Sequence, residues 1–469
     1  MGGGLLQLVA YGAQDVYLTG NPQITFFKVV YRRHTNFAME AIQQTFNGVA
    51  DYGNTVYCQI SRNGDLIHRT YLEVGINATT ATKSASAAYS YVNYLGLRLL
   101  KSVSIEIGGQ QIDKHYSDWL YIWNELSLPR GKRYAYDAMV GADRDALNSG
   151  VYGVNDITTL FIPLEFWFCR NIGLALPLIA LQYHEVKIKI EFETAANCMY
   201  NINGAAAPVT TDVKLNSPTL WVDYIYLDTD ERRKFAQLSH EYLIEQLQFT
   251  GQESFTSSGA RIKLNFNHPC KELIWVAKPT TLASQWYNYT INTGLDNGVL
   301  AANPTNAATA GFLPTGSLAT ETDFYDSSNV AGAAITTAQL NNYLQDSFIP
   351  YSDSSTAIIN PFDTCLLQLN GNDRFNVRNG NYFNLVQPYQ HHTNIPLNRG
   401  VNVYSFALKP EEHQPSGTLN MSRIDTAVLD VKIKSGNNNT GVSGNLNIYA
   451  VNYNVLHILS GMGGLAYSN

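Results

Sequence analysis

The residues best suited to catalysis or metal binding do not stand at the spacings that such chemistry requires. His240 and Glu241 match the start of a zinc-protease HExxH helix, but no second histidine follows at the required distance. His391 and His392 are neighbours, so on a strand their side chains would point to opposite faces. The chain also lacks a phosphate-binding GxxxxGK(S/T) loop, a GxSxG nucleophile elbow and the HxH pair of a cupin metal site. These patterns predict no enzyme, no metal site and no cofactor.

The cysteines do not form the pattern of a disulfide-stabilised protein. Their number is odd, their spacing is wide and no CxxC pair is present. The five positions are Cys58, Cys169, Cys198, Cys270 and Cys365. We therefore expect reduced cysteines in the core of a protein made in the cytosol.

Four Asn-X-Ser/Thr sequons are candidate glycosylation sites, and they begin at Asn77, Asn288, Asn420 and Asn438. The chain starts with MGGGLL, without the basic region and apolar run of a secretory signal, and no stretch is apolar enough to span a bilayer. Leu6 also occupies the position where a myristoylation signal has Ser or Thr. We expect the sequons to arise by chance in an Asn- and Thr-rich chain, although glycosylation remains an open interpretation.

Composition favours a large self-associating protein over a nucleic-acid-binding protein. The 469 residues exceed what one core usually serves, so we expect two domains of roughly 200 residues. The net charge of −7 argues against a surface that binds phosphates. Because only 15% of residues are charged, well below the usual share of about a quarter, neutral polar residues must supply the surface. Such a surface repels neighbours weakly and suits packing against copies of the same chain.

Alternation of apolar and polar residues predicts many antiparallel strands. In the clearest case, Val186 to Phe192, every second residue is apolar and the others are Lys or Glu. Similar alternation occurs at 56–60, 103–107, 262–266 and 429–433. The segment after Ser117 instead has apolar residues at helical spacing up to Pro129, which predicts a helix. Many strands with few helices indicate an all-β sandwich or jelly roll.

Two features indicate a duplicated fold. The segment 227–248 begins with a helix start, Asp228 followed by Glu231, and lies between two strand-rich halves, so we expect a helical connector there. In each half an aromatic-rich strand precedes a proline-containing connection and an amphipathic strand. These segments are 161–168 with 186–192 in the first half and 401–406 with 429–433 in the second. This faint internal repeat is what duplication of a β-sandwich would leave.

Residues 279–373 differ in composition from the rest of the chain. They contain no Lys or Arg, while large aromatic residues such as Trp286 and Tyr287 recur. Disordered linkers are usually poor in such side chains. We therefore expect long, ordered, acidic loops that pack on one another and on neighbouring subunits.

The N-terminal residues 1–36 predict an arm followed by an anchoring strand. Residues 24–31 have the composition of a strand that is apolar on both faces. The glycines at 2–4 cannot hold a fold alone, whereas the residues after them are too apolar to stay in water. We expect the arm to dock onto another surface during assembly; the alternative is that it adds a strand to its own first domain. The candidate assembly residues are Leu5, Leu6, Leu8, Val9, Tyr11, Phe26, Phe27, Tyr31, Arg32 and Arg33.

Three long stretches carry a resemblance to a known family. They are LTGNPQITFFKVVYRRHTNF at 18–37, LDTDERRKFAQLSHEYLIEQLQ at 227–248 and NIYAVNYNVLHILSGMGGLAYSN at 447–469. In sequence and position they resemble the major capsid proteins of nucleocytoplasmic large DNA viruses, a double jelly-roll family. The resemblance spans the chain.

The resemblance implies an all-β fold of two consecutive eight-stranded antiparallel jelly rolls, with a few short helices and long surface loops. It divides the chain into the arm at 1–36, a first jelly roll at 37–226, a connecting helical segment at 227–248 and a second jelly roll at 249–469, with outer loops at 279–373. The implied function is structural: homotrimeric, pseudo-hexagonal capsomers that assemble in the host cytoplasm into the outer icosahedral shell of a large double-stranded DNA virus. The implied partners are further copies of the chain and minor capsid and penton proteins, with no direct nucleic-acid contact and no transmembrane segment.

A second interpretation comes from another functional class. The aromatic residues of 279–373 could form the sugar platform of a glycan-binding β-sandwich surface protein. The lack of a visible secretory signal and of paired cysteines argues against this alternative. A jelly-roll metalloenzyme is disfavoured by the missing ligand cluster.

Overall fold

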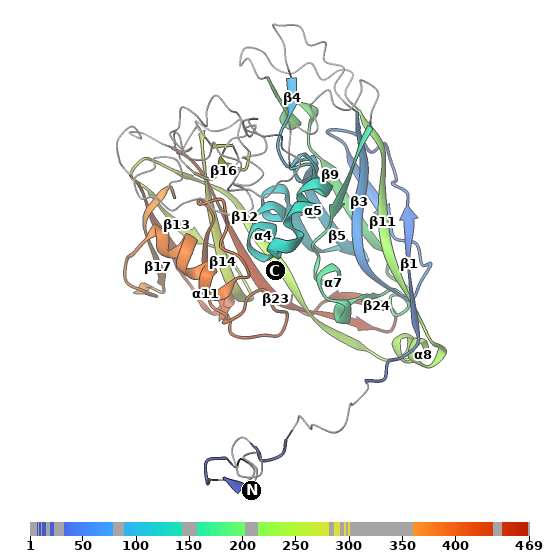
Figure 1. The fold of residues 1–469 in the computed structure, drawn as a ribbon. Helices are drawn as coiled ribbons and strands as arrows, with labels where there is room; N and C mark the ends of the chain where they lie inside the picture. The colour runs from blue at the N-terminus through green and yellow to red at the C-terminus, as the bar shows by residue number, and fades with distance from the viewer. Residues whose placement is uncertain are drawn as a thin grey trace, which may run out of the picture. The chain divides into compact units, whose positions relative to one another are not determined.

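The protein, a computed structural model, divides into two compact units, Met1–Phe37 and Ala38–Asn469. The structure describes residues 7, 9–10, 12–15, 19–22, 32–77, 89–142, 157–201, 214–280, 286–290, 295–296, 299–300, 360–434 and 443–467. The larger unit holds two β-sandwiches and a few short helices (Figure 1).

The first half of the larger unit is a sandwich of two sheets, which we call sheets A and B. Sheet A contains, in spatial order, β1 (Phe37–Gln44), β11 (Leu215–Leu227), β3 (Leu66–Asn77) and β7 (Ile157–Pro163), with β8 (Leu176–Pro177) also paired to β3. Sheet B contains β2 (Thr55–Gln59), β9 (Val186–Phe192), β5 (Leu100–Ile107) and β6 (Gln110–Tyr116). A separate small pair joins β4 (Tyr89–Tyr91) to β10 (Met199–Asn201). This sandwich is the first roll.

The second half repeats this arrangement with sheets C and D, which form the second roll. Sheet C contains β12 (His240–Phe255), β23 (Gly444–Leu459), β14 (Pro269–Pro279) and β20 (Asn402–Ser405), joined by β21 (Leu419–Asn420) and β24 (Met462–Leu465). Sheet D contains β13 (Ala260–Leu264), β22 (Ala427–Ile433), β17 (Phe362–Leu369) and β18 (Asn372–Asp373), with β19 (Arg378–Asn379) paired to β17. A short pair of β15 (Leu295–Asp296) and β16 (Val299–Leu300) stands apart.

The two rolls share one strand order. When the main strands of each roll are numbered along the chain, sheets A and C both have the order 1-8-3-6, and sheets B and D both have the order 2-7-4-5. The predicted repeat is confirmed. The amphipathic strands expected at 186–192 and 429–433 are β9 and β22, the seventh strand of each roll, and the segments expected before them contain part of β7 and β20, the sixth strand of each roll. The fold is the double jelly roll that the sequence predicted.

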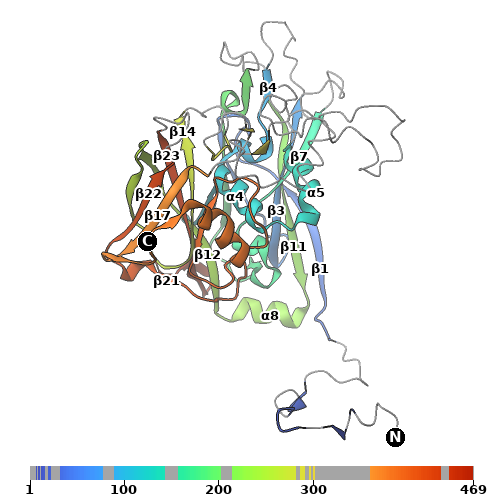
Figure 2. The same cartoon turned by 60° about the vertical axis from the view of Figure 1, so that its left-hand side comes forward.

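Short helices lie in the connections. They are α3 (Leu95–Leu99), α4 (Ser117–Ser127), α5 (Arg130–Val140), α7 (Trp167–Arg170), η1 (Ile172–Leu174), η2 (Ala195–Cys198), α8 (Thr229–Gln237), the π-helical η5 (Tyr382–Val386), α11 (Gln387–His391) and η6 (Met421–Arg423). The helix predicted before Pro129 is confirmed as α4. Figure 2 shows α8 crossing one end of the larger unit between β11 and β12. No helix among the described residues is long and apolar enough to cross a membrane.

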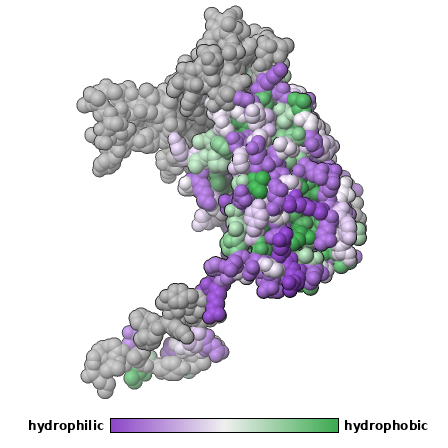
Figure 3. Space-filling model, turned by 90° about the vertical axis from the view of Figure 1, so that its right-hand side faces the viewer, coloured by the Kyte–Doolittle hydropathy of each residue, from purple (hydrophilic) through white to green (hydrophobic). Residues whose placement is uncertain are grey.

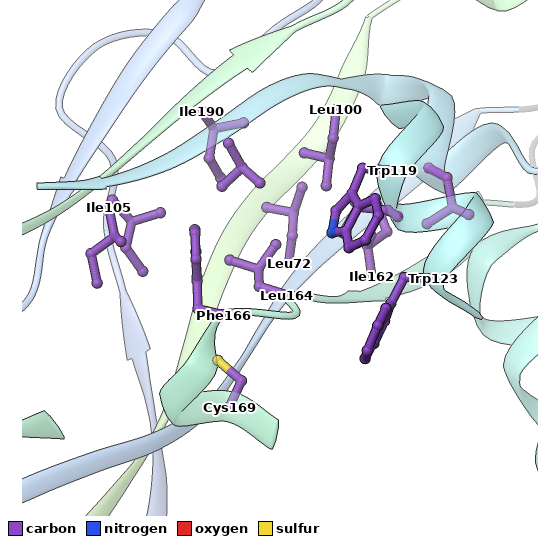
Figure 4. Close-up of a cluster of buried hydrophobic side chains, with 14 of the residues drawn as sticks. Leu72, Leu100, Ile105, Trp119, Trp123, Ile162, Leu164, Phe166, Cys169 and Ile190 are labelled. Atoms are coloured by element: carbon purple, nitrogen blue, oxygen red, sulfur yellow. The ribbon is translucent and has the colours of Figure 1, made fainter. Parts of the chain in front are cut away.

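The core of the first roll follows from strand alternation. In β9 every second side chain is buried, including Ile188 and Ile190, while the lysines between them are half-exposed. Figure 4 shows this core, where Ile190 of sheet B and Leu72 of sheet A lie in one cluster with Trp119 of α4. All five cysteines are buried and free, as predicted.

Two predicted boundaries are wrong. The connector at 227–248 is helical only over α8, because residues from His240 onward belong to β12, which pairs with β23. The predicted outer loops at 279–373 include β17, which lies between β22 and β18 in sheet D, and Tyr287 and Tyr289, which are fully buried. Most of the remaining loop residues lie outside the described residues.

Candidate functional site: the contact between the two rolls

The central part of β14 in sheet C is apolar on both faces. In β14, Leu273 and Trp275 belong to the core of the second roll, whereas Ile274 and Val276 belong to the cluster centred on the first roll. Strands that are covered on both sides lose the alternation of apolar and polar residues, and the run Leu273 to Ala277 has this character. The outer face of sheet C is therefore the contact surface between the rolls.

Helix α4 provides the main apolar contribution from the first roll. Trp119 lies against Tyr449 of β23, with ring centroids 5.7 Å apart. Tyr121 stacks on Tyr287 at 4.6 Å, so the segment 286–290 also enters the contact. All four rings are at most 2% exposed. Buried aromatic pairs of this kind add about 0.5–1.5 kcal/mol each beyond the burial of their area.

A cluster of polar side chains centred on Asp118 lies beside these rings. Asp118 at the start of α4 forms an ion pair with Lys278 of β14 at 2.6 Å and accepts a hydrogen bond from the Tyr289 hydroxyl at 2.9 Å. Burial and Asp118 raise the pKa of Tyr289 well above its ordinary value of 10, so its hydroxyl stays protonated and can donate. Asn447 of β23 donates to Asp118 at 3.4 Å. The Asp118 cluster thus fixes the first turn of α4 on sheet C.

The other end of α4 is held by the second roll as well. The backbone N–H of Asn394 donates to the Leu126 carbonyl at 3.0 Å, and the N–H of Leu397 donates to Glu125 Oε2 at 3.0 Å. The last carbonyls of a helix have no partner inside the helix and need one outside it. The second roll supplies such a partner, so α4 is fixed at both ends.

A buried ion cluster joins α7 of the first roll to sheet C. Glu245 of β12 lies 3.1 Å from Arg170 and 2.7 Å from Lys271, whose side chain is fully buried. Arg170 also lies over the ring of Trp123, 4.7 Å from its centroid. Burial alone would raise the pKa of Glu245, but Arg170, His413 and Lys271 lower it to about 2. Removing one partner of such a cluster leaves an uncompensated buried charge, which costs about 3–5 kcal/mol.

The C-terminal strand β24 continues sheet C and binds the first roll. The N–H of Tyr183 donates to the Gly461 carbonyl at 2.9 Å, and His184 Nδ1 lies 2.9 Å from the Gly463 carbonyl. Gly461 has φ +82, and an added Cβ would stand 2.6 Å from the Tyr183 ring. The turn before β24 therefore favours a glycine at position 461, where it contacts the first roll.

The histidines singled out in the sequence have structural surroundings. His391 and His392 lie at the end of α11, not on a strand. His392 is fully buried, 2.9 Å from both Glu272 and Glu411, and these carboxylates overcome burial and raise its pKa to about 9. The Glu272 contact is poorly aligned for a hydrogen bond and acts as an ion pair. Within the described part of the chain, no group of three or more His, Cys, Asp or Glu residues could hold a metal ion.

The predicted assembly residues lie mostly outside the described residues. Val9, Arg32 and Arg33 are described, and all three are exposed. The strand expected at 24–31 falls outside the described residues. The members that lie outside the described residues are Leu5, Leu6, Leu8, Tyr11, Phe26, Phe27 and Tyr31.

The sequons stand in different surroundings. Asn288 is 2% exposed and its Oδ1 accepts hydrogen bonds from the N–H and hydroxyl of Thr290, so a glycan at this position does not fit the fold. Asn420 is exposed and accepts from the Ser422 N–H at 3.1 Å. Asn77 ends β3, and Asn438 lies outside the described residues.

The contact between the rolls was not predicted from the sequence. Its ion pairs join residues far apart in the chain, such as Arg170 with Glu245, and no local pattern connects them. The apolar run in β14 was a usable signal, because it indicates burial on both faces.

Two family models cover nearly the whole described chain. Residues 25–228 match "Major capsid protein N-terminus", and residues 231–464 match "Large eukaryotic DNA virus major capsid protein". The major capsid protein of Phaeocystis pouchetii virus is 48% identical, and that of Paramecium bursaria Chlorella virus 1 is 44% identical, with all of each chain covered. The chain belongs to the major capsid protein family of large eukaryotic DNA viruses. As a member of this family, it is a structural capsid component.

Solved capsid structures agree with this assignment. A chain of the PBCV-1 virus capsid is similar with a TM-score of 0.70 and 39% identity, over 95% of this chain and 100% of that one. The Faustovirus major capsid protein has a TM-score of 0.65 at 14% identity, which shows the shared fold. The family models meet between residues 228 and 231, where α8 begins.

Proposed function

We propose that three copies of this chain form a capsomer with a nearly hexagonal outline, and that many capsomers tile the outer icosahedral shell of a large DNA virus. The observation that carries this proposal is the shared strand order of two rolls held together by the buried contact. Two similar rolls per chain give six similar rolls in a trimer, so threefold symmetry yields a six-sided tile.

The proposed mechanism is burial of complementary surfaces, without a reaction or a cofactor. The relatives are structural capsid proteins, which supports a non-enzymatic role. We propose the virion shell as the site of action and the host cytoplasm as the site of assembly. Minor capsid and penton proteins are the proposed partners beneath and beside each capsomer.

The N-terminal arm is the proposed contact with those partners. Val9 of the arm is an apolar side chain that is 73% exposed, and docking onto another surface would bury it. Deleting residues 2–14 should leave the trimer and its Tm unchanged while capsomers no longer assemble, as seen by sedimentation. A Tm loss of several degrees would place the arm in the fold instead.

Native mass spectrometry tests the trimer directly. One chain has a mass of 52.0 kDa, so the trimer should have three times that mass at micromolar concentration. A particle with the mass of one chain would contradict the proposal. The glycan-binding alternative gains no support from the relatives named above, and it predicts that single-chain mass.

A further inference from the structure

One row of side chains on the outer face of sheet C marks the contact within the chain. Val403, Ile274 and Tyr449 are direct cross-strand partners on β20, β14 and β23. All three are at most 1% exposed, and Tyr449 lies against Trp119 of α4. The first roll of the same chain therefore covers this row.

Sheet A has a corresponding row of outward-facing side chains on its sixth, third and eighth strands. Pro163, Tyr71 and Trp221 are direct partners on β7, β3 and β11, which are the sixth, third and eighth strands of the first roll. Tyr71 stacks on Trp221 with centroids 6.3 Å apart and planes at 8°, and Phe161 lies 6.3 Å from Tyr71. The three side chains of this row are only partly buried, and the neighbouring Phe161 is 36% exposed. Figure 3, which looks onto the side of the larger unit that bears β1 and β11 in Figure 1, shows apolar residues among polar ones.

The group that covers sheet C also has a counterpart. In the first roll, α4 lies between the fifth and sixth strands; in the second roll, η5 and α11 lie between the fifth and sixth strands. The apolar residues of α4 are buried, whereas Val386 of η5 and Tyr389 of α11 are 39% and 77% exposed. In Figure 1, α11 lies on the flank away from β1 and β11. The η5–α11 segment has the position of α4, but among the described residues no second roll covers Val386 and Tyr389.

Carboxylates on sheet A and guanidinium groups beside η5 provide charges of opposite sign, although sheet A also exposes Arg69 of β3. On sheet A, Glu73 is the cross-strand partner of Phe161, and Asp223 lies two residues after Trp221 on β11, on the same face. Beside η5, Arg374 and Arg378 are exposed, and the Arg378 guanidinium lies 4.3 Å from the Tyr382 ring centroid. The outer face of sheet A thus offers aromatic rings and carboxylates. The η5–α11 surface offers aliphatic, aromatic and guanidinium groups that can pair with them.

We propose that the outer face of sheet A receives the η5–α11 segment of a second copy of this chain. The contact within each chain is then repeated between chains, so that every roll offers its 1-8-3-6 sheet to the next roll. Contact between two different surfaces is head-to-tail, and it closes into a ring when the rotation allows. This inference rests on the trimer proposed above and names the two surfaces that build it.

Two blocked variants test the contact. The sheet A variant is Glu73→Lys with Phe161→Lys, and the α11 variant is Arg378→Glu with Tyr389→Glu. A matched control, Tyr57→Lys with Gln59→Lys, changes the outer face of sheet B, where Tyr57 is 38% exposed, close to the 36% of Phe161. In native mass spectrometry each blocked variant should be a single chain, while the control and the unmodified chain are trimers. In an equimolar mixture, the intact η5–α11 segment of the sheet A variant can still bind the intact sheet A of the α11 variant. Because the other two surfaces are blocked, the mixture should yield particles of two chains.

The outcomes separate this inference from the trimer itself. Trimers from either blocked variant, or a mixture that stays monomeric at the highest soluble concentration, would overturn the inference. A monomeric unmodified chain would overturn the trimer instead. If a variant does not fold, as judged by circular dichroism, hydroxyl-radical footprinting of the unmodified trimer decides the question. Tyr389 should be protected and Tyr134 labelled, although they are 77% and 80% exposed in one chain; equal labelling would reject the contact.

Discussion

Two buried charge clusters in this protein have opposite composition. At the contact between the rolls, one carboxylate, Glu245, lies among the cations Arg170 and Lys271 and the ring of His413. Inside the second roll, one imidazole, His392, lies between the two carboxylates Glu272 and Glu411. The first cluster joins two rolls, whereas the second joins elements of one roll.

Because the central groups of the two clusters have pKa values shifted in opposite directions, pH affects the stability contributions of Glu245 and His392 in different ranges. The pKa of Glu245 is lowered, so its contribution is present above its unfolded pKa and is lost as pH falls through its folded pKa. The pKa of His392 is raised, so its contribution is present below its unfolded pKa and is lost as pH rises through its folded pKa. Glu245 therefore adds to the acid limb of a stability profile, and His392 adds to the alkaline limb. The pKa of Glu411 beside His392 is also lowered, so acid acts on both clusters whereas alkali acts through His392 on the second alone.

The largest expected effect comes from breaking the contact cluster. Glu245→Ala leaves Arg170 and Lys271 as uncompensated buried charges, and we expect a loss of about 3–5 kcal/mol in the free energy of unfolding. Urea unfolding measures this loss. The matched control is Glu241→Ala on the same strand, where the side chain is 70% exposed and the loss should be about 0.5 kcal/mol or less. Equal losses would show that the cluster does not hold the rolls together.

Acid should weaken the unmodified protein in a defined range. Between the ordinary pKa of 4.5 and the folded value of about 2, Glu245 takes up a proton and its stabilisation is lost. The shift corresponds to about 3 kcal/mol. Urea unfolding at a series of pH values checks this, and Glu245→Gln should flatten the profile there. An unchanged acid limb in that variant would assign the loss to other carboxylates.

Alkali should act on the second roll between pH 6.5 and about 9, the ordinary and folded pKa values of His392. Loss of the imidazolium removes the ion pairs to Glu272 and Glu411, at a cost of up to about 3 kcal/mol. The His392→Gln variant should be less stable at pH 6.5 but nearly independent of pH up to 9. NMR titration of the His392 ring offers a second check, and a pKa near 6.5 would contradict the assignment.

The smallest expected effect is at the rim of the contact. The side chains of Lys278 and Asp118 are 20% and 15% exposed, so water partly screens their ion pair. Lys278→Ala should cost about 1 kcal/mol or less in urea unfolding. A loss as large as that of Glu245→Ala would show that the whole contact acts as one charged network.

The sequence predicted those elements that local pattern determines. The alternation in β9 and β22 and the helical spacing of α4 gave correct elements, and the order of similar segments indicated the repeat. The short helix expected in the connecting segment is present as α8, but residues 240–248 of that segment form a strand, because β12 pairs with β23, some 200 residues later in the chain. The contact surface depends on such distant partners throughout, so local pattern could not locate it.

The most direct test of the central claim is cryo-electron microscopy of the purified capsomer. Two similar rolls fixed in each chain should appear as six roll-sized lobes around a threefold axis. Alternate lobes should differ slightly, because the first and second rolls differ in their connections. A particle with three lobes, or with lobes at variable angles within a chain, would contradict the claim that the buried contact makes each chain one rigid third of a six-sided tile.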